Sequence, residues 1–230
     1  YHFSYEESCI REVVESIHPD ETIFLGAFDT NYKWAELKTH AGAFSAGLMN
    51  VLSAFVGCST GRFIYLSSEE VFQQEFMETI PEDETPVAVT AKGQALAVGE
   101  GMCKYYRNMG KDVVTLRLDH MYGMPGSALE AKNICGRMCV EALETREILV
   151  GKDQRTALLH ESDAVEFIYR VVAAQEPKYG LYQISSGEPI SQKEIAEMGL
   201  SVPQVARIFT RLAEKGYPVN PNVFRVEDAV

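Results

Sequence analysis

Side chains that accept or donate protons follow two apolar runs of this sequence. Ser68, Glu69 and Glu70 follow the run Phe63–Leu66 after one further serine, and His120 comes just after a later run. In α/β proteins, ligand sites form at the ends of such strands, so His120 is a candidate proton donor. Simpler interpretations stay open for the other three. Ser68 can satisfy the end of the strand, and the two glutamates can form a solvated acidic turn.

Lys92 is a further titratable candidate, at the beginning of a predicted helix. A buried lysine has a depressed pKa and can act as a base, whereas an exposed lysine at a helix start has no such role. Both interpretations stay open. Cys135 and Cys139 are four residues apart, but no second pair of ligands with metal spacing accompanies them. We therefore expect no metal site.

Elements of the α/β type are predicted to position these residues. Helical and strand patterns alternate through the first 120 residues, and this order predicts a parallel sheet with helices on both faces. Helices are predicted at residues 6–17, 35–56, 90–109, 133–143, 163–174, from 192 (with Ser191 as its cap) and at 205–215. Strands are predicted at residues 22–27, 63–66, 112–118, 148–151 and 180–184.

Charge and cysteine content restrict the partners and the compartment. The formal net charge is −12, from 33 acidic and 21 basic residues among 230. So acidic a surface repels phosphate backbones, and we expect no nucleic-acid partner. Five scattered cysteines indicate reduced thiols, and no apolar run reaches the ~18 residues of a membrane span. We expect a soluble, cytoplasmic protein without membrane association.

Several short motifs occur in a distinctive order along the chain. They are HPD at 18–20, RFIYLSSEEVF at 62–72, VTLR at 114–117, MYG at 121–123, GKDQR at 151–155, SDAV at 162–165 and YQISSGEPIS at 182–191. Together they resemble the extended short-chain dehydrogenase/reductase family, the NAD-dependent nucleotide-sugar epimerases and dehydratases. The resemblance implies a Rossmann-like, doubly wound parallel sheet within residues 1–123. For residues 124–230 it implies a small substrate lobe plus elements that return to the main sheet.

The sequence departs from the pattern of this family at the positions that bind the cofactor and at those that transfer protons. None of its 17 glycines forms the glycine-rich dinucleotide turn, so the first βαβ portion is expected to be missing. The family's catalytic tyrosine precedes a lysine by four residues, and none of the 11 tyrosines here does. When Glu100, expected near a helix start, is aligned with the family's helix glutamate, Lys92 stands at the tyrosine position and Leu96 at the lysine position. When Lys92 is taken as the lysine, Ala88 takes the tyrosine's place. Phe44 stands where an asparagine is expected.

The resemblance assigns roles to the remaining polar residues. Ser68 matches the catalytic serine or threonine, and Glu69 and Glu70 match the acid and base that eliminate water in 4,6-dehydratases. Arg155 matches the arginine that binds the substrate diphosphate, a task suited to its planar fork of donors. His120 stands in place of an asparagine and is the candidate replacement donor.

These observations lead to three hypotheses. The chain is an NAD-dependent epimerase/dehydratase family protein acting on a nucleotide sugar, for instance in polysaccharide synthesis. Alternatively, it is a non-catalytic pseudoenzyme that binds a sugar nucleotide or pairs with an active paralogue. In a third hypothesis it is an enzyme with a base relocated to Lys92 or His120. The predicted helices at 35–56 and 90–109 match those by which family members pair, so a homodimer is expected.

Overall fold

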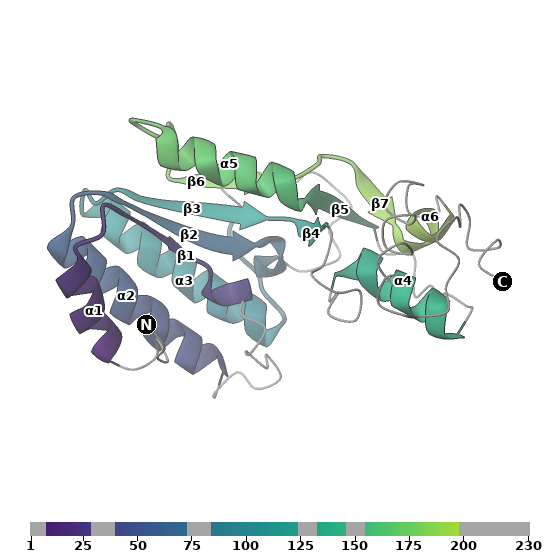
Figure 1. Cartoon of the computed structure of the whole chain (residues 1–230), viewed down its shortest axis with the longest axis horizontal. Helices are drawn as coiled ribbons and strands as arrows, with labels where there is room; N and C mark the ends of the chain where they lie inside the picture. The colour runs from purple at the N-terminus through teal and green to yellow at the C-terminus, as the bar shows by residue number, and fades with distance from the viewer. Residues whose placement is uncertain (1–7, 29–39, 73–83, 124–132, 146–154, 198–230) are drawn as a thin grey trace, which may run out of the picture. The chain divides into compact units, whose positions relative to one another are not determined.

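The computed structural model describes residues 8–28, 40–72, 84–123, 133–145 and 155–197. The chain forms two compact units, each described separately below (Figure 1). The first comprises Tyr1–Asp119 and Val165–Ile184, and the second comprises His120–Ala164 and Ser185–Val230. The chain therefore leaves the first unit after Asp119 and returns to it at Val165.

The first unit contains a parallel sheet of four strands in the order β1-β2-β3-β6. The strands are β1 Glu21–Phe24, β2 Arg62–Ser68, β3 Val113–Leu118 and β6 Leu181–Ile184. Every residue of the two central strands, β2 and β3, is buried, as expected of strands covered on both faces. Ser68 is in register with Leu118, so the carboxyl ends of these two strands lie side by side.

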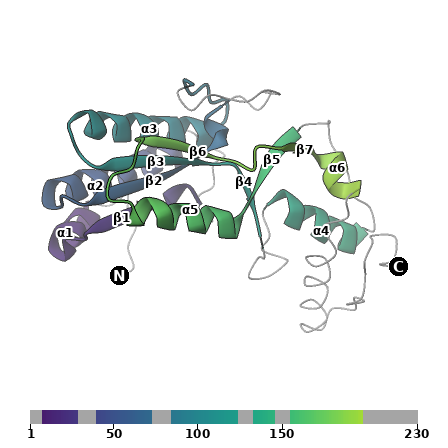
Figure 2. The same cartoon turned by 90° about the horizontal axis from the view of Figure 1, so that it is seen from above.

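Helices cover both faces of this sheet, which confirms the predicted α/β fold. α1 Cys9–Ile17, α2 Gly42–Cys58 and α3 Ala91–Asn108 lie on one face, and α5 Glu161–Ala173 lies on the other (Figure 1). α2 and α3 are neighbours (Figures 1 and 2). α2 has no charged residue anywhere along its length, so its outer face is apolar or weakly polar as well as its inner face.

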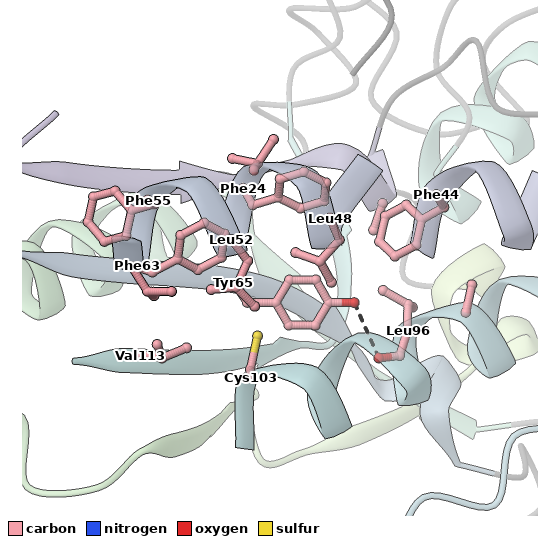
Figure 3. Packing of buried hydrophobic residues seen from close by; sticks show 14 of the residues in the cluster. Phe24, Phe44, Leu48, Leu52, Phe55, Phe63, Tyr65, Leu96, Cys103 and Val113 are labelled. Carbon is pink, nitrogen blue, oxygen red and sulfur yellow. Dashed lines mark hydrogen bonds between the residues drawn. The ribbon is translucent and has the colours of Figure 1, made fainter. Parts of the chain in front are cut away.

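Aromatic side chains fill the core between the sheet and its helices α2 and α3 (Figure 3). The rings of Phe24 and Phe44 meet edge to face at 5.8 Å, and those of Phe24 and Phe63 stack at 6.4 Å. The Tyr65 hydroxyl donates a hydrogen bond to the Leu96 carbonyl at 3.2 Å, so its polar end is satisfied inside the core (Figure 3). Burial raises the pKa of Tyr65 well above its usual value, and the hydroxyl stays protonated.

A buried arginine connects β2 to the last turn of α5. Arg62 is 5% exposed, and its Nη1 donates to the carbonyls of Val171 at 2.6 Å and Ala174 at 2.7 Å. Carbonyls at a helix C-terminus lack partners within the helix, so the guanidinium completes this end of α5. Asp112, with its Oδ2 at 2.9 Å from Nη2, balances the charge.

The second unit contains a small mixed sheet and two helices. β5 Arg155–His160 lies between β4 His120–Tyr122, which is parallel to it, and β7 Pro189–Ser191, which is antiparallel. α4 Ile134–Thr145 and α6 Gln192–Glu197 contribute Ile134, Cys135, Met138 and Ile195 to a small apolar core. α6 begins at the predicted cap. Ser191 Oγ accepts from the Glu194 amide at 3.0 Å, and the Glu194 carboxylate accepts from the Ser191 amide at 2.8 Å.

Most predicted elements within the described residues are confirmed, with changes at their ends. The strand predicted at 22–27 ends at Phe24 and is followed by a 3-10 turn, η1 Gly26–Phe28. The strands of the second unit, β4, β5 and β7, were not predicted, because each is short and none shows a regular alternation of buried and exposed residues. The strand predicted at 148–151 and the helix at 205–215 lie outside the described residues.

Candidate functional site

The hydroxyl of Ser68 makes two hydrogen bonds at the point where β2 ends. Ser68 is 4% exposed and begins a 3-10 turn, η3 Glu69–Val71. Its Oγ accepts from the Glu70 amide at 3.3 Å and donates to Glu69 Oε2 at 2.8 Å. The hydroxyl therefore caps the turn and holds the Glu69 carboxylate at the carboxyl end of the strand.

Lys92 and Glu70 form an ion pair beside this turn. Lys92 occupies the second position of α3, and its Nζ lies 2.7 Å from Glu70 Oε1. The side chains are 20% and 23% exposed, so Lys92 is neither fully buried nor the exposed lysine that one interpretation of the sequence allowed. Glu69 and Glu70 lie in a turn at the end of the strand, where both are partly buried and Glu70 is paired.

Gly93 allows α3 to approach η3 closely enough for this pair. A Cβ atom on Gly93 would lie 2.1 Å from the carbonyl oxygen of Glu70, a contact that the two backbones cannot accommodate without moving apart. Thr90 caps the helix at the same place, and its Oγ1 accepts from the Gly93 amide at 2.9 Å. Cap and glycine together place Lys92 against Glu70.

A buried polar network joins α3 to β2 and β3. Arg117 donates from Nε and Nη2 to the two carboxylate oxygens of Glu100, at 2.9 and 2.8 Å, and Ser67 Oγ donates to Glu100 Oε1 at 2.7 Å. The arginine and glutamate are 3% and 7% exposed, and the guanidinium lies 4.7 Å from the centre of the Phe72 ring. Glu100 lies in the middle of α3, not near its start as expected. Sequence reasoning missed Ser67 and the pairing role of Arg117, although an arginine within an apolar strand is a signal.

In the second unit, His120 is the first residue of β4. Its Nδ1 lies 3.0 Å from Thr156 Oγ1 on β5. A second histidine on this sheet, His160, was not singled out from the sequence. Its Nδ1 lies 2.7 Å from Ser162 Oγ and accepts from the Ser162 amide at 3.2 Å, and the Tyr122 ring meets it edge to face at 5.1 Å. Both imidazoles are thus oriented by hydrogen bonds made within the second unit.

Arg155 is the first residue of β5 and is held at the surface of the second unit. Its side chain is 47% exposed, and Nη2 lies 3.1 Å from Glu194 Oε2 and donates to the Pro189 carbonyl at 3.2 Å. Hydrogen bonds from Ser191, and then the charge of Arg155, lower the pKa of Glu194. The guanidinium is therefore accessible to an anion but already paired with a carboxylate.

The structure brings four of the six predicted site residues together and places the other two elsewhere. Ser68, Glu69, Glu70 and Lys92 form one cluster in the first unit. His120 and Arg155 belong to the second unit.

No helix in the part of the chain that the structure describes is long and apolar enough to cross a membrane. Among the same residues, no group of three His, Cys, Asp or Glu side chains is placed to hold a metal ion. Cys135 is buried, and burial raises the pKa of its thiol to about 11, so it stays protonated at neutral pH. The side chain of Cys139, its predicted neighbour, lies outside the described residues.

The model of the NAD dependent epimerase/dehydratase family matches residues 5–185 of this chain. The chain belongs to this family. No curated protein matches its sequence significantly.

Solved structures of nucleotide-sugar epimerases and related enzymes share the fold of this epimerase/dehydratase family member. UDP-glucose 4-epimerase from Thermotoga maritima is 18% identical with a TM-score of 0.71, over 86% of this chain and 67% of that one. The enzyme WbmG from Bordetella bronchiseptica, in complex with NAD and UDP, is 20% identical with a TM-score of 0.69, over 84% and 59%. UDP-glucuronic acid 4-epimerase from Bacillus cereus is 19% identical with a TM-score of 0.68, over 82% and 60%. The matched part of this chain thus corresponds to only 59 to 67% of these three chains.

With Glu100 aligned to the family's helix glutamate, the described residues of this family member place no tyrosine–lysine pair for proton transfer beside NAD. Leu96, at the lysine position when Glu100 is aligned, is fully buried in the aromatic core. Lys92, at the tyrosine position, is held by Glu70. Phe44, at the asparagine position, is fully buried and packs against Phe24. An apolar core side chain cannot hold a ribose hydroxyl or support a proton transfer.

Proposed function

We propose that this epimerase/dehydratase family member binds a nucleotide sugar without exchanging hydride with it. The observation that carries the proposal is the occupation of the tyrosine and lysine positions by Lys92, paired with Glu70, and by the core residue Leu96. The alternative alignment puts Ala88 at the tyrosine position, and alanine has no proton to give. Hydride transfer from the sugar carbon that bears a hydroxyl needs a base to take the proton of that hydroxyl, and neither alignment supplies the family's base.

Thermal unfolding and a turnover assay together test this proposal. A nucleotide sugar such as UDP-glucose at ~100 times its dissociation constant should stabilise the protein by about 2.7 kcal/mol, a shift of several degrees. Neither the nicotinamide absorbance nor the sugar should change over hours with NAD present. Absence of a shift with uridine- and thymidine-diphosphate sugars would refute binding. A change in nicotinamide absorbance would refute the non-catalytic part.

For the diphosphate we propose Arg155 in the second unit. Its guanidinium is half exposed, and the planar donor fork suits a diphosphate. Arg155→Ala should weaken UDP binding about tenfold or more, because one charge-assisted contact contributes roughly 1.5–3 kcal/mol. The matched control is Arg170→Ala, which also removes an exposed arginine from a carboxylate pair, with Glu166. Equal effects of the two substitutions would exclude Arg155 as the ligand.

A second candidate is an enzyme that acts on the nucleotide sugar with a relocated base. The specific observation in its favour is the Lys92–Glu70 pair at 2.7 Å beside Ser68, which places an amine and a carboxylate together at the end of the strand. His120 is the other candidate base. Turnover that disappears in Lys92→Ala or in His120→Ala, with the melting temperature kept, would favour this enzyme over a binding protein.

For the quaternary structure we propose pairing through α2 and α3, in a homodimer or with an active paralogue. α2 carries no charged residue. Val98 and Tyr105 on α3 are 49 and 59% exposed, and Met109, directly after the helix, is 63% exposed. Light scattering should give twice the chain mass of 25.6 kDa. Val98→Asp should give the monomer, because a charge in the middle of an apolar interface is costly. If the wild-type protein is a monomer, the homodimer is excluded and only pairing with an active paralogue remains.

For the cellular setting we propose the cytoplasm and a role in polysaccharide synthesis. The described cysteines Cys9, Cys58, Cys103 and Cys135 are all free thiols, as is usual where glutathione keeps proteins reduced. Nucleotide sugars are the donors from which polysaccharides are built. Fractionation of the source cells, followed by detection of this chain in the cytosolic or the membrane fraction, tests the location.

A further inference from the structure

Arg155 of the second unit is held along one edge of its guanidinium. Nε and Nη2 donate to the Pro189 carbonyl at 3.3 and 3.2 Å, and Nη2 also lies 3.1 Å from Glu194 Oε2. The other terminal nitrogen, Nη1, makes no hydrogen bond or ion pair with any residue that the structure describes. A guanidinium has five N–H donors, so the two protons of Nη1 stay available to a ligand.

Glu194 is fixed by the beginning of α6 and not by Arg155 alone. Its Oε2 accepts from the Ser191 amide at 2.8 Å, and its own amide donates to Ser191 Oγ at 3.0 Å. These hydrogen bonds are the main cause of the lowered pKa of Glu194, so its carboxylate is ionised at neutral pH. The cap of a helix therefore places a negative charge 3.1 Å from Nη2 of Arg155.

This contact has two opposite effects on an anion that binds at Nη1. It fixes the arginine side chain, so less conformational entropy is lost when the anion binds. It also brings a negative charge close to the anion, which repels it. Arg155 and Glu194 are 47% and 43% exposed, so water screens the pair and the carboxylate cancels the charge of the guanidinium only in part.

We infer that Glu194 sets the affinity of the second unit for a diphosphate, by orienting Arg155 and by cancelling part of its charge. The inference rests on the proposed role of Arg155 as the diphosphate ligand. A phosphate oxygen accepts from Nη1 while Glu194 stays on Nη2. The site therefore binds a diphosphate more weakly than an arginine that is held in the same orientation by neutral acceptors alone.

Two substitutions of Glu194 separate the two effects. In Glu194→Gln, the carboxamide oxygen can take the place of Oε2 and accept from the Ser191 amide, because glutamine also serves at this position of a capping box. The same oxygen can accept from Nη2 of Arg155, so the orientation is kept and the charge is removed. Glu194→Ala removes both, and leaves the guanidinium held by the Pro189 carbonyl alone.

Titration calorimetry on the full chain, with UDP as the probe, tests the inference. At low ionic strength Glu194→Gln should bind UDP about threefold more tightly than the wild type, the effect of removing one charge a few ångströms away in water. The gain should shrink between about 0.01 M and about 1 M NaCl, as the Debye length falls from about 30 Å to about 3 Å. Glu194→Ala should bind UDP more weakly than Glu194→Gln.

The matched control is Glu166→Gln on α5. It removes the same charge from another exposed pair with an arginine, Arg170, and should leave the affinity for UDP unchanged. The inference is overturned if Glu194→Gln binds UDP no more tightly than the wild type, or if Glu166→Gln gives the same gain. Equal affinities of Glu194→Ala and Glu194→Gln would overturn the orienting role.

Failure of the proposed function gives a different result. If UDP does not bind to the wild type, or binds equally well to Arg155→Ala, then Arg155 is not the diphosphate ligand and the inference falls with that proposal. If UDP binds and Arg155→Ala weakens it, the proposed ligand stands, and the Glu194 variants alone decide the inference.

Discussion

The buried pair of Arg117 and Glu100 gives the sharpest test of how this fold is stabilised. Arg117→Met keeps much of the side-chain volume but leaves the Glu100 carboxylate, 7% exposed, without its cation. Removing one partner of a buried pair costs about 3–5 kcal/mol, because the remaining charge is desolvated and uncompensated. Loss of the guanidinium from the face of the Phe72 ring adds to this cost.

The assay is urea unfolding followed by circular dichroism, supported by the melting temperature. For a chain of this size, a loss of about 3–5 kcal/mol lowers the melting temperature by roughly 6–20 °C. The control is Arg170→Met, which breaks an exposed ion pair with Glu166 on α5, and should cost less than about 0.5 kcal/mol.

A compensated variant separates charge burial from packing. In the triple variant Arg117→Met, Glu100→Leu and Ser67→Ala, the three side chains that these hydrogen bonds join all become apolar, so none of the three remains as a buried polar group without its partner. Apolar replacement of a buried pair is often neutral, and we expect at least half of the lost stability to return. The reasoning is refuted if Arg117→Met costs no more than Arg170→Met, or if the triple variant is less stable than Arg117→Met alone.

Three further outcomes follow from the structure. Gly93→Ala should destabilise by about 2 kcal/mol or more, because its Cβ would lie 2.1 Å from the Glu70 carbonyl oxygen. Gly101→Ala on the same helix has open space and should stabilise by about 0.5–1 kcal/mol, so equal melting temperatures of the two variants would contradict the geometry. Burial raises the pKa of Cys103 from 9.0 to about 12, so this thiol stays protonated in the folded state while the unfolded chain releases the proton. The free energy of unfolding should therefore fall between about pH 9 and pH 12, and fall less steeply in Cys103→Ala, as urea titrations at each pH would measure.

Elements that depend on neighbouring residues could be predicted from the sequence. Apolar spacing located the helices and strands of the first unit, and the Ser191–Glu194 capping box follows from residues three apart. The order of motifs indicated the family, which the family model confirms. The short strands of the second unit were missed, because three to six residues with mixed burial give no periodic signal.

Pairings between distant residues were decided by the tertiary structure alone. The sequence supplied Lys92 and Glu70 as separate candidates, with an exposed lysine and a solvated turn among their interpretations. Their ion pair depends on the approach of α3 to η3 that Gly93 allows. Arg62 reaches the carbonyl of Val171, which lies more than a hundred residues along the chain, only because β2 and α5 pack together.

The sequence by itself therefore determined the α/β class, the family and the loss of the tyrosine–lysine pair, since these depend on residue types at fixed spacing. The tertiary structure decided how the replacing residues are used. It buried Leu96 in the core, paired Lys92 with Glu70 and enclosed Glu100 with Arg117. Charge pairing depends on distances of a few ångströms between elements, and only the packing of helices against strands sets those distances.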